Sequence, residues 1–177
     1  YPYSEAELVF LMKHDSDAFN RWDAGQRLAM QTILSLLAAH QQQEAFGLEH
    51  DFISAYQAIL TDATLDHALR AEALTLPSEA DIAERARPSD PEAIHTVREF
   101  IHATLAKALR LDLEALYADL HAQGQGDYSP DAASIGRRSL KNVCLAYLGR
   151  IQDDGIHETC LQQYMTAGNM TDAMAAL

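Results

Sequence analysis

The longest helical pattern in the chain, residues 17–43, reads DAFNRWDAGQRLAMQTILSLLAAHQQQ. Asp17 is a good N-cap residue, and the polar run at 40–43 ends the pattern. Between these limits, apolar side chains recur at spacings of three, four and seven, which predicts an amphipathic helix of about six turns. The apolar face consists of Phe19, Trp22, Ala29, Ile33, Leu36 and Leu37. A helix of this length needs other helices against its apolar face, so this stretch sets the class of the fold.

Similar patterns occur on both sides of this helix. Ser4 and Glu7 form a capping box, Ser78 is a further N-cap, and Asp90–Pro91 places a cap before a first-turn proline. No proline interrupts an apolar face. Helices are expected near residues 5–12, 18–40, 52–60, 65–74, 91–105, 113–120, 140–151 and 156–167, with one more after the cap at Ser78 and a last one beginning at Asn169. The prediction is an all-α fold of nine or ten antiparallel helices, stacked either as a bundle or as a curved superhelical array.

Composition and charge exclude several classes of partner. Acidic residues outnumber basic ones by 26 to 13, and a net charge of −13 repels a phosphate backbone, so no nucleic acid partner is expected. No apolar run is long enough to cross a bilayer, and the first residues lack the zones of a signal peptide, so no membrane partner is expected. Cys144 and Cys160 lie within helical patterns, which favours reduced core thiols over a disulfide and a cytoplasmic location.

Two clusters could hold a metal, and neither is convincing. The stretch His157–Leu161 begins like an H-E-x-x-H zinc motif, but Leu161 stands at the second histidine position. Cys160 could replace that ligand, although core packing is the favoured role for it. A second set lies at helical spacing on one face, where solvated pairs are the favoured interpretation. This set is Glu92, His95, Glu99 and His102.

Other candidates also have a plain structural interpretation. Gly124–Gly126 resembles the start of a nucleotide-binding loop, but no strand precedes it. The only compact basic cluster could bind an anion, and is expected instead to be solvated or paired on the exposed side of its helix. It consists of Arg137, Arg138 and Lys141. Arg21 and Trp22 suggest a ligand contact, but Trp22 is better explained as a buried anchor between helices. No catalytic, cofactor-binding or metal-ligating residue is predicted in this chain.

Four stretches carry a resemblance to a known family. They are LVFLMKHDSDAFNRWDAGQRLA (8–29), AEALTLPSEADIAE (71–84), RRSLKNVCLAYL (137–148) and AGNMTDAMAAL (167–177). With these stretches the chain resembles the bacterial aminopeptidase N family of zinc metallopeptidases, specifically the front half of its C-terminal helical domain. Within the stretches, NRWDAGQ, LTLPSE, RRSLKN and NMTDA are not generic helix patterns.

The resemblance implies that residues 1–177 form a single helical domain, truncated at its C-terminal side, of a larger multidomain chain. The abrupt start at Tyr1 and the apolar ending fit this expectation. The parent enzyme would remove N-terminal residues from peptides, using zinc ligands that lie upstream of this segment. Its catalytic and β-sandwich domains would be the partners of this segment, which would wall or cap the active-site chamber.

Two alternatives remain open. The chain could be a free-standing α-helical module that binds a peptide or protein on a concave surface. It could also be a small independent metalloenzyme that uses the face of His95 and His102.

Overall fold

The computed structural model describes residues 3–45, 47–124, 126 and 128–177, and it has ten helices and no strands in these ranges. The predicted all-α class is therefore confirmed. The helices are α1 (Glu5–His14), α2 (Ala18–Gln41), α3 (His50–Thr61), α4 (His67–Leu74), α5 (Glu79–Arg85), α6 (Pro91–Ala108), α7 (Arg110–Gln123), α8 (Ala132–Leu148), α9 (Asp154–Thr166) and α10 (Met170–Ala175).

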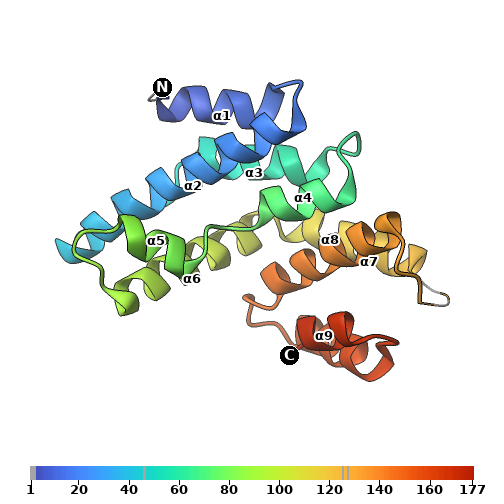
Figure 1. Ribbon diagram of the computed structural model, residues 1–177. Coiled ribbons are helices and arrows are strands. Elements are labelled where there is room, and N and C mark those ends of the chain that lie inside the picture. The colour runs from blue at the N-terminus through green and yellow to red at the C-terminus, as the bar shows by residue number, and fades with distance from the viewer. Residues whose placement is uncertain (1–2, 46, 125, 127) are drawn as a thin grey trace.

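The helices are stacked along one direction (Figure 1). At one end, α1 packs on α2 and α3, and α2 in turn contacts α4 and α6. Next in the stack, α4 and α7 both pack against α8. The opposite end is formed by α9 and α10, where α10 contacts both α8 and α9. Helices thus bury their apolar faces both on the next helix in the chain and on more distant ones, as α4 does on α8, and one continuous core runs through the stack.

Several helix starts are where the local sequence signals place them. Ser4 and Ser78 form complete capping boxes with the residues three positions later. The carboxylate of Asp17 accepts hydrogen bonds from two backbone amides of the first turn of α2, at 2.8 and 3.0 Å. Asp90 caps α6 in the same way, ahead of Pro91. These starts depend on residues within a few positions of one another, and for this reason the sequence predicts them well.

The first turn of α2 differs from its predicted orientation. Phe19 is 65% exposed, so the prediction that it lies in the core is wrong, and Trp22 is only half-buried with its ring 5.3 Å from that of Phe19. Arg21 is buried in their place. Its guanidinium donates to the carbonyl of Met12 at 2.9 Å and forms an ion pair with Asp62 at 2.7 Å. These partners satisfy the buried charge, and they turn the two aromatic rings towards the surface.

The connector between α4 and α5 is held by three other helices. Its backbone has carbonyls that no helix satisfies, and each of the three described here accepts a hydrogen bond from a side chain. The bonds run from Tyr147 Oη to Leu74 O (2.6 Å), from Gln26 Nε2 to Thr75 O (2.8 Å) and from Arg98 Nε to Pro77 O (3.0 Å). The LTLPSE stretch is therefore fastened at once to α8, α2 and α6.

A glycine allows α4 and α8 to approach closely. A Cβ atom on Gly136 would lie 3.0 Å from the backbone nitrogen of Ala68 and 3.4 Å from its Cβ. Backbone cannot move aside as a flexible side chain can, so this position of α8 requires glycine.

The cysteines and the helix lengths bear on two further expectations. Both cysteines are free thiols, as predicted, with Cys144 buried and Cys160 partly buried against the core. Burial raises the pKa of the Cys144 thiol to about 12, which keeps it protonated and unreactive. Within the described ranges, no helix has the length and apolar character needed to cross a membrane.

Candidate functional site

The four residues at helical spacing on α6 do not form a metal site. The exposed His95 pairs through Nδ1 with Glu79 of α5 at 2.9 Å, and Glu99 pairs with Arg150 at 3.2 Å. His102 is turned inward, with its ring 5.1 Å from that of Tyr147. These side chains are thus directed to different partners.

His102 has an unusual environment. Both of its ring nitrogens are buried and lack a hydrogen-bond partner in the described part of the chain. Burial is the main cause that lowers the pKa of His102 to about 4, and the nearby Arg98 and Arg150 lower it further. The imidazole is therefore neutral at physiological pH, and it lies apart from any second ligand.

The remaining metal and nucleotide candidates are also separate. His157 is exposed on α9, whereas Cys160 packs partly against the core. Gly124 is the C-cap residue of α7, and Gln125, at the centre of the glycine loop, lies outside the described residues. Among the residues that the structure describes, no group of three or more histidine, cysteine or acidic side chains could hold a metal ion.

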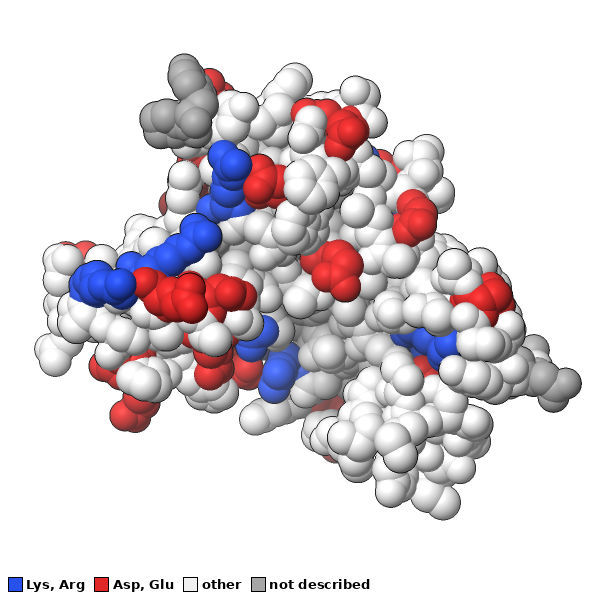
Figure 2. Space-filling model, in the orientation of Figure 1, with Lys and Arg blue, Asp and Glu red and all other residues white. Residues whose placement is uncertain are grey.

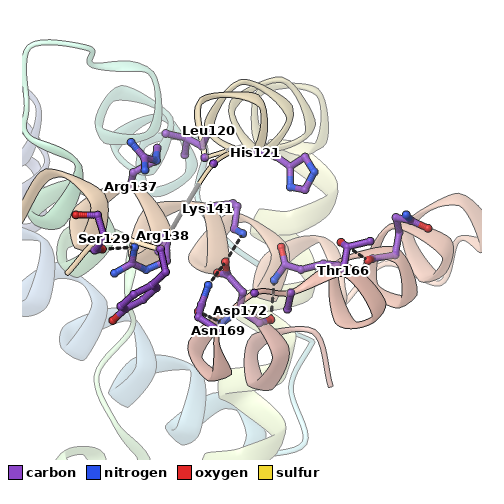
Figure 3. Close-up of a pocket in the computed structure, with 16 residues that line it drawn as sticks. Leu120, His121, Ser129, Arg137, Arg138, Lys141, Thr166, Asn169 and Asp172 are labelled. Carbon is purple, nitrogen blue, oxygen red and sulfur yellow. Dashed lines mark hydrogen bonds and ion pairs between the residues drawn. The ribbon is translucent and has the colours of Figure 1, made fainter. Parts of the chain in front are cut away.

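The basic cluster, by contrast, lines a pocket. A cavity of about 370 Å³ lies among α7, α8, α9 and α10 (Figure 3). Arg137, Arg138 and Lys141 all border it. The expectation that the cluster lies on the exposed side of α8 is wrong for Lys141, which is 7% exposed and forms an ion pair with Asp172 at 2.9 Å. The side of α8 that looks solvent-facing in sequence is covered because α10 packs against it.

The floor of this pocket is a closed hydrogen-bond network. Asp172 accepts from Lys141, from Asn142 Nδ2 at 2.9 Å and from Asn169 Nδ2 at 3.0 Å. Burial acts to raise the pKa of this carboxyl, but the three donors together outweigh it and hold the pKa below its usual value. Asp172 is therefore ionised, and all its donors come from the RRSLKN and NMTDA stretches.

Gln163 of α9 extends the floor towards α7. Its carbonyl oxygen accepts from the hydroxyl of Tyr117 at 2.9 Å, while its amide donates to Asn142 at 3.0 Å and to the backbone carbonyl of Asp172 at 2.9 Å. Sequence reasoning missed Gln163 because a glutamine gives no burial signal. Its burial could have been inferred from its position, because it lies seven residues after the apolar Ile156 and therefore on the same face of α9.

The two arginines on the rim have no carboxylate partner among the residues that the structure describes. Arg138 donates to the carbonyl of Ser129 at 2.9 Å, and its guanidinium lies 4.8 Å from the centre of the Tyr128 ring (Figure 3). Arg137 donates to the hydroxyl of Ser134 at 3.3 Å, and its Nε is buried with no partner. Neither guanidinium forms an ion pair within the described ranges. Within the described part of the pocket, the charge of these two cations is thus not compensated by a carboxylate.

Charge is distributed unevenly over the visible face of the molecule. Figure 2 shows acidic and basic side chains next to one another around α5, and further basic side chains in the recess beside α9. Among the described residues that line the pocket there is a single carboxylate, that of Asp172, for three cations. In a chain of net charge −13, this is a local reversal of sign.

Comparisons with known proteins give a consistent result. Residues 5–177 match the family described as "Domain of unknown function (DUF3458_C) ARM repeats". The chain is 40% identical over 177 residues to aminopeptidase N of Escherichia coli K12, and 32% identical over 178 residues to aminopeptidase N of Haemophilus influenzae Rd. Each alignment covers 100% of this chain and 20% of the relative, so the chain spans about a fifth of the length of these proteins.

A solved structure agrees with these relatives. The crystal structure of Legionella pneumophila aminopeptidase A in complex with aspartic acid matches with a TM-score of 0.82 and 29% sequence identity. The match covers 99% of this chain and 21% of that one. The similarity therefore extends over all ten described helices and is confined to one part of the larger protein.

Proposed function

The chain belongs to the DUF3458_C family of ARM-repeat domains, and from that premise we propose that it is a noncatalytic helical segment of a zinc-dependent aminopeptidase. One observation carries the proposal. The chain is 40% identical to aminopeptidase N of E. coli along its whole length, while it covers 20% of that protein. A segment that matches end to end within a longer enzyme is best explained as the corresponding segment of a similar enzyme.

The proposed parent is a cytoplasmic multidomain enzyme that removes N-terminal residues from peptides. A zinc ion held elsewhere in the parent would supply the polarisation of the scissile carbonyl and the activation of water. The described residues of this chain do not fit that metal, since they offer no cluster of three ligands. The ligands are therefore assigned to another part of the parent, and residues 1–177 are assigned to a single helical domain that packs against its catalytic and β-sandwich domains.

The proposed role of the segment is to wall the active-site chamber and so limit which peptides enter. A rigid helical stack suits this role. At the α4–α5 connector, side chains from α2, α6 and α8 donate hydrogen bonds to the backbone and so hold these helices together. The exposed apolar side chains of α9 and α10 are assigned to contacts with the rest of the parent. They include Leu161, Tyr164, Met165, Met170 and Met174.

The proposed role in limiting peptide entry is tested in the intact enzyme with two substrates, an alanyl arylamide and a peptide of about ten residues. Lys141→Met removes the cation that holds α10 on α8 and loosens this end of the stack. The ratio of kcat/KM for the peptide to that for the arylamide should change at least threefold. Arg27→Met is the matched control, because Arg27 lies on exposed α2 surface, paired with Asp23. An unchanged ratio with Lys141→Met would show that the segment does not limit entry.

A further inference from the structure

We propose that the pocket among α7, α8, α9 and α10 binds a small oxyanion, the carboxylate or phosphate group of a soluble ligand. This site is independent of the proposed peptidase function, and nothing in the aminopeptidase assignment requires it. The inference rests on three features of the pocket: its surplus of cations, its remaining hydrogen-bond donors and its rigid floor.

The surplus of cations is the first feature. Lys141 is neutralised by Asp172, whereas the acceptors of Arg137 and Arg138 among the described residues are neutral oxygens. The chain has twice as many acidic as basic residues, so carboxylates are abundant on its surface. Even so, no described carboxylate pairs with either guanidinium. An anion entering the pocket supplies that missing charge.

The remaining hydrogen-bonding capacity is the second feature. Arginine and lysine side chains carry donors and no acceptors. After the contacts to Ser129 and Ser134, each arginine keeps further terminal N–H groups for a ligand, whereas the Nε of Arg137 is buried and has no partner among the described residues. A planar guanidinium fork matches the oxygen pairs of carboxylate and phosphate. The free capacity of the two arginines therefore selects an acceptor ligand that is negatively charged.

The rigid floor is the third feature. Asp172 and Gln163 have their acceptors occupied by Lys141, Asn142, Asn169 and Tyr117, so neither competes with an incoming anion for the arginines. Arg138 is also held in place, by its hydrogen bond to the carbonyl of Ser129 (Figure 3) and by the ring of Tyr128, whose centre is 4.8 Å from the guanidinium. Groups that are fixed before binding lose little conformational entropy when the ligand arrives. The volume of about 370 Å³ suits a small molecule.

The test uses the intact natural protein that carries this sequence and two probes, inorganic phosphate and glutarate, titrated by isothermal calorimetry at fixed ionic strength. Binding of either probe with a Kd of about 1 mM or tighter is expected. Binding of phosphate alone identifies a phosphorylated ligand, and binding of glutarate alone identifies a carboxylate ligand. No heat with either probe up to about 10 mM overturns the proposal, and so does a pocket already filled by another part of the chain.

Variants localise the binding. Arg137→Gln and Arg138→Gln should each weaken the bound probe at least tenfold, and Arg27→Gln removes the same charge from a distant exposed position and should leave the Kd within twofold. Arg138 lies on the rim, so Arg138→Gln remains informative if the partly buried Arg137 proves necessary for folding; far-UV circular dichroism checks the fold of each variant. Equal weakening in all three variants would mean a general charge effect and would overturn the site.

Discussion

Tyr147 and Tyr56 allow one chemical change to be made in two buried environments. Both side chains are buried, at 5% and 1% exposure. The hydroxyl of Tyr147 donates to the carbonyl of Leu74 at 2.6 Å, whereas the hydroxyl of Tyr56 has no hydrogen-bond partner in the described part of the chain. Removing each hydroxyl, as Tyr147→Phe and Tyr56→Phe, therefore separates the value of a hydrogen bond from the effect of losing an oxygen atom.

The magnitudes follow from what each variant leaves behind. Tyr147→Phe strands the Leu74 carbonyl in a dry interface, and it should lower the free energy of unfolding by about 2 kcal/mol. For a chain of this length that is a fall in Tm of about 4–8 °C. Tyr56→Phe removes a buried donor that has no acceptor, and it should be neutral or stabilise by up to about 1 kcal/mol.

The assay is urea denaturation of the 177-residue chain followed by circular dichroism, with a thermal scan as a second readout. The slope m should stay the same in both variants, so that a shift in the midpoint reports stability alone. Equal losses in the two variants, or a larger loss in Tyr56→Phe, would refute the assignment of the Tyr147 bond as a fastening of the α4–α5 connector.

Three further changes test other parts of the stack. Gly136→Ala should destabilise by about 1–2 kcal/mol because the new Cβ meets backbone of α4, whereas Gly25→Ala meets only a flexible methionine and should be neutral or stabilising; equal Tm values would contradict this. His102 is neutral in the folded protein because its pKa is lowered from the ordinary 6.5 to about 4. Its contribution to the free energy of unfolding is therefore complete above pH 6.5 and is lost as the pH falls towards 4. The loss is at most about 3 kcal/mol, and His102→Phe should remove this part of the pH dependence in urea titrations between pH 7 and 4. Lys141→Met should cost about 3 kcal/mol by leaving Asp172 buried without its cation, and adding Asp172→Asn should recover part of that loss; no recovery would show that charge is not the cause.

The sequence predicts those parts of the fold that depend on neighbouring residues. The caps at Ser4, Asp17 and Ser78 act within one turn, and the helices begin where these residues stand. The orientation of the first turn of α2 depends instead on the pairing of Arg21 with Asp62, which lies 41 residues away. No periodicity within α2 can reveal such a partner, and this explains why Phe19 was assigned to the core.

The stretches that carry the family resemblance have a structural reason to be distinctive. Gln26 of NRWDAGQ and Tyr147 at the end of RRSLKNVCLAYL both bind the backbone of LTLPSE. Lys141 and Asn142 of RRSLKN bind Asp172 of NMTDA. These residues are polar and make specific contacts between elements, so generic helix formers cannot replace them.

The basic pocket could be predicted only in part. The cluster of Arg137, Arg138 and Lys141 is visible in the sequence, but an amphipathic pattern assigns it to solvent. The structure covers it because α10 folds back onto α8. α9 lies between these two helices in the chain, so their contact gives no periodic signal in the sequence of either. The one available hint is Asp172 of NMTDA, an acidic residue with no cation in its own helix.

The central claim is that this chain is a segment of a larger aminopeptidase. The most direct measurement is the mass, in a lysate of the source cell, of the native polypeptide that contains residues 167–177, with zinc-dependent alanyl arylamide hydrolysis assayed on the same fraction. The account predicts a polypeptide about five times larger than 19.6 kDa, since the chain covers 20% of its relatives, and that polypeptide should co-purify with the activity. A native product of about 19.6 kDa without activity would contradict it and would favour a free-standing helical binding module.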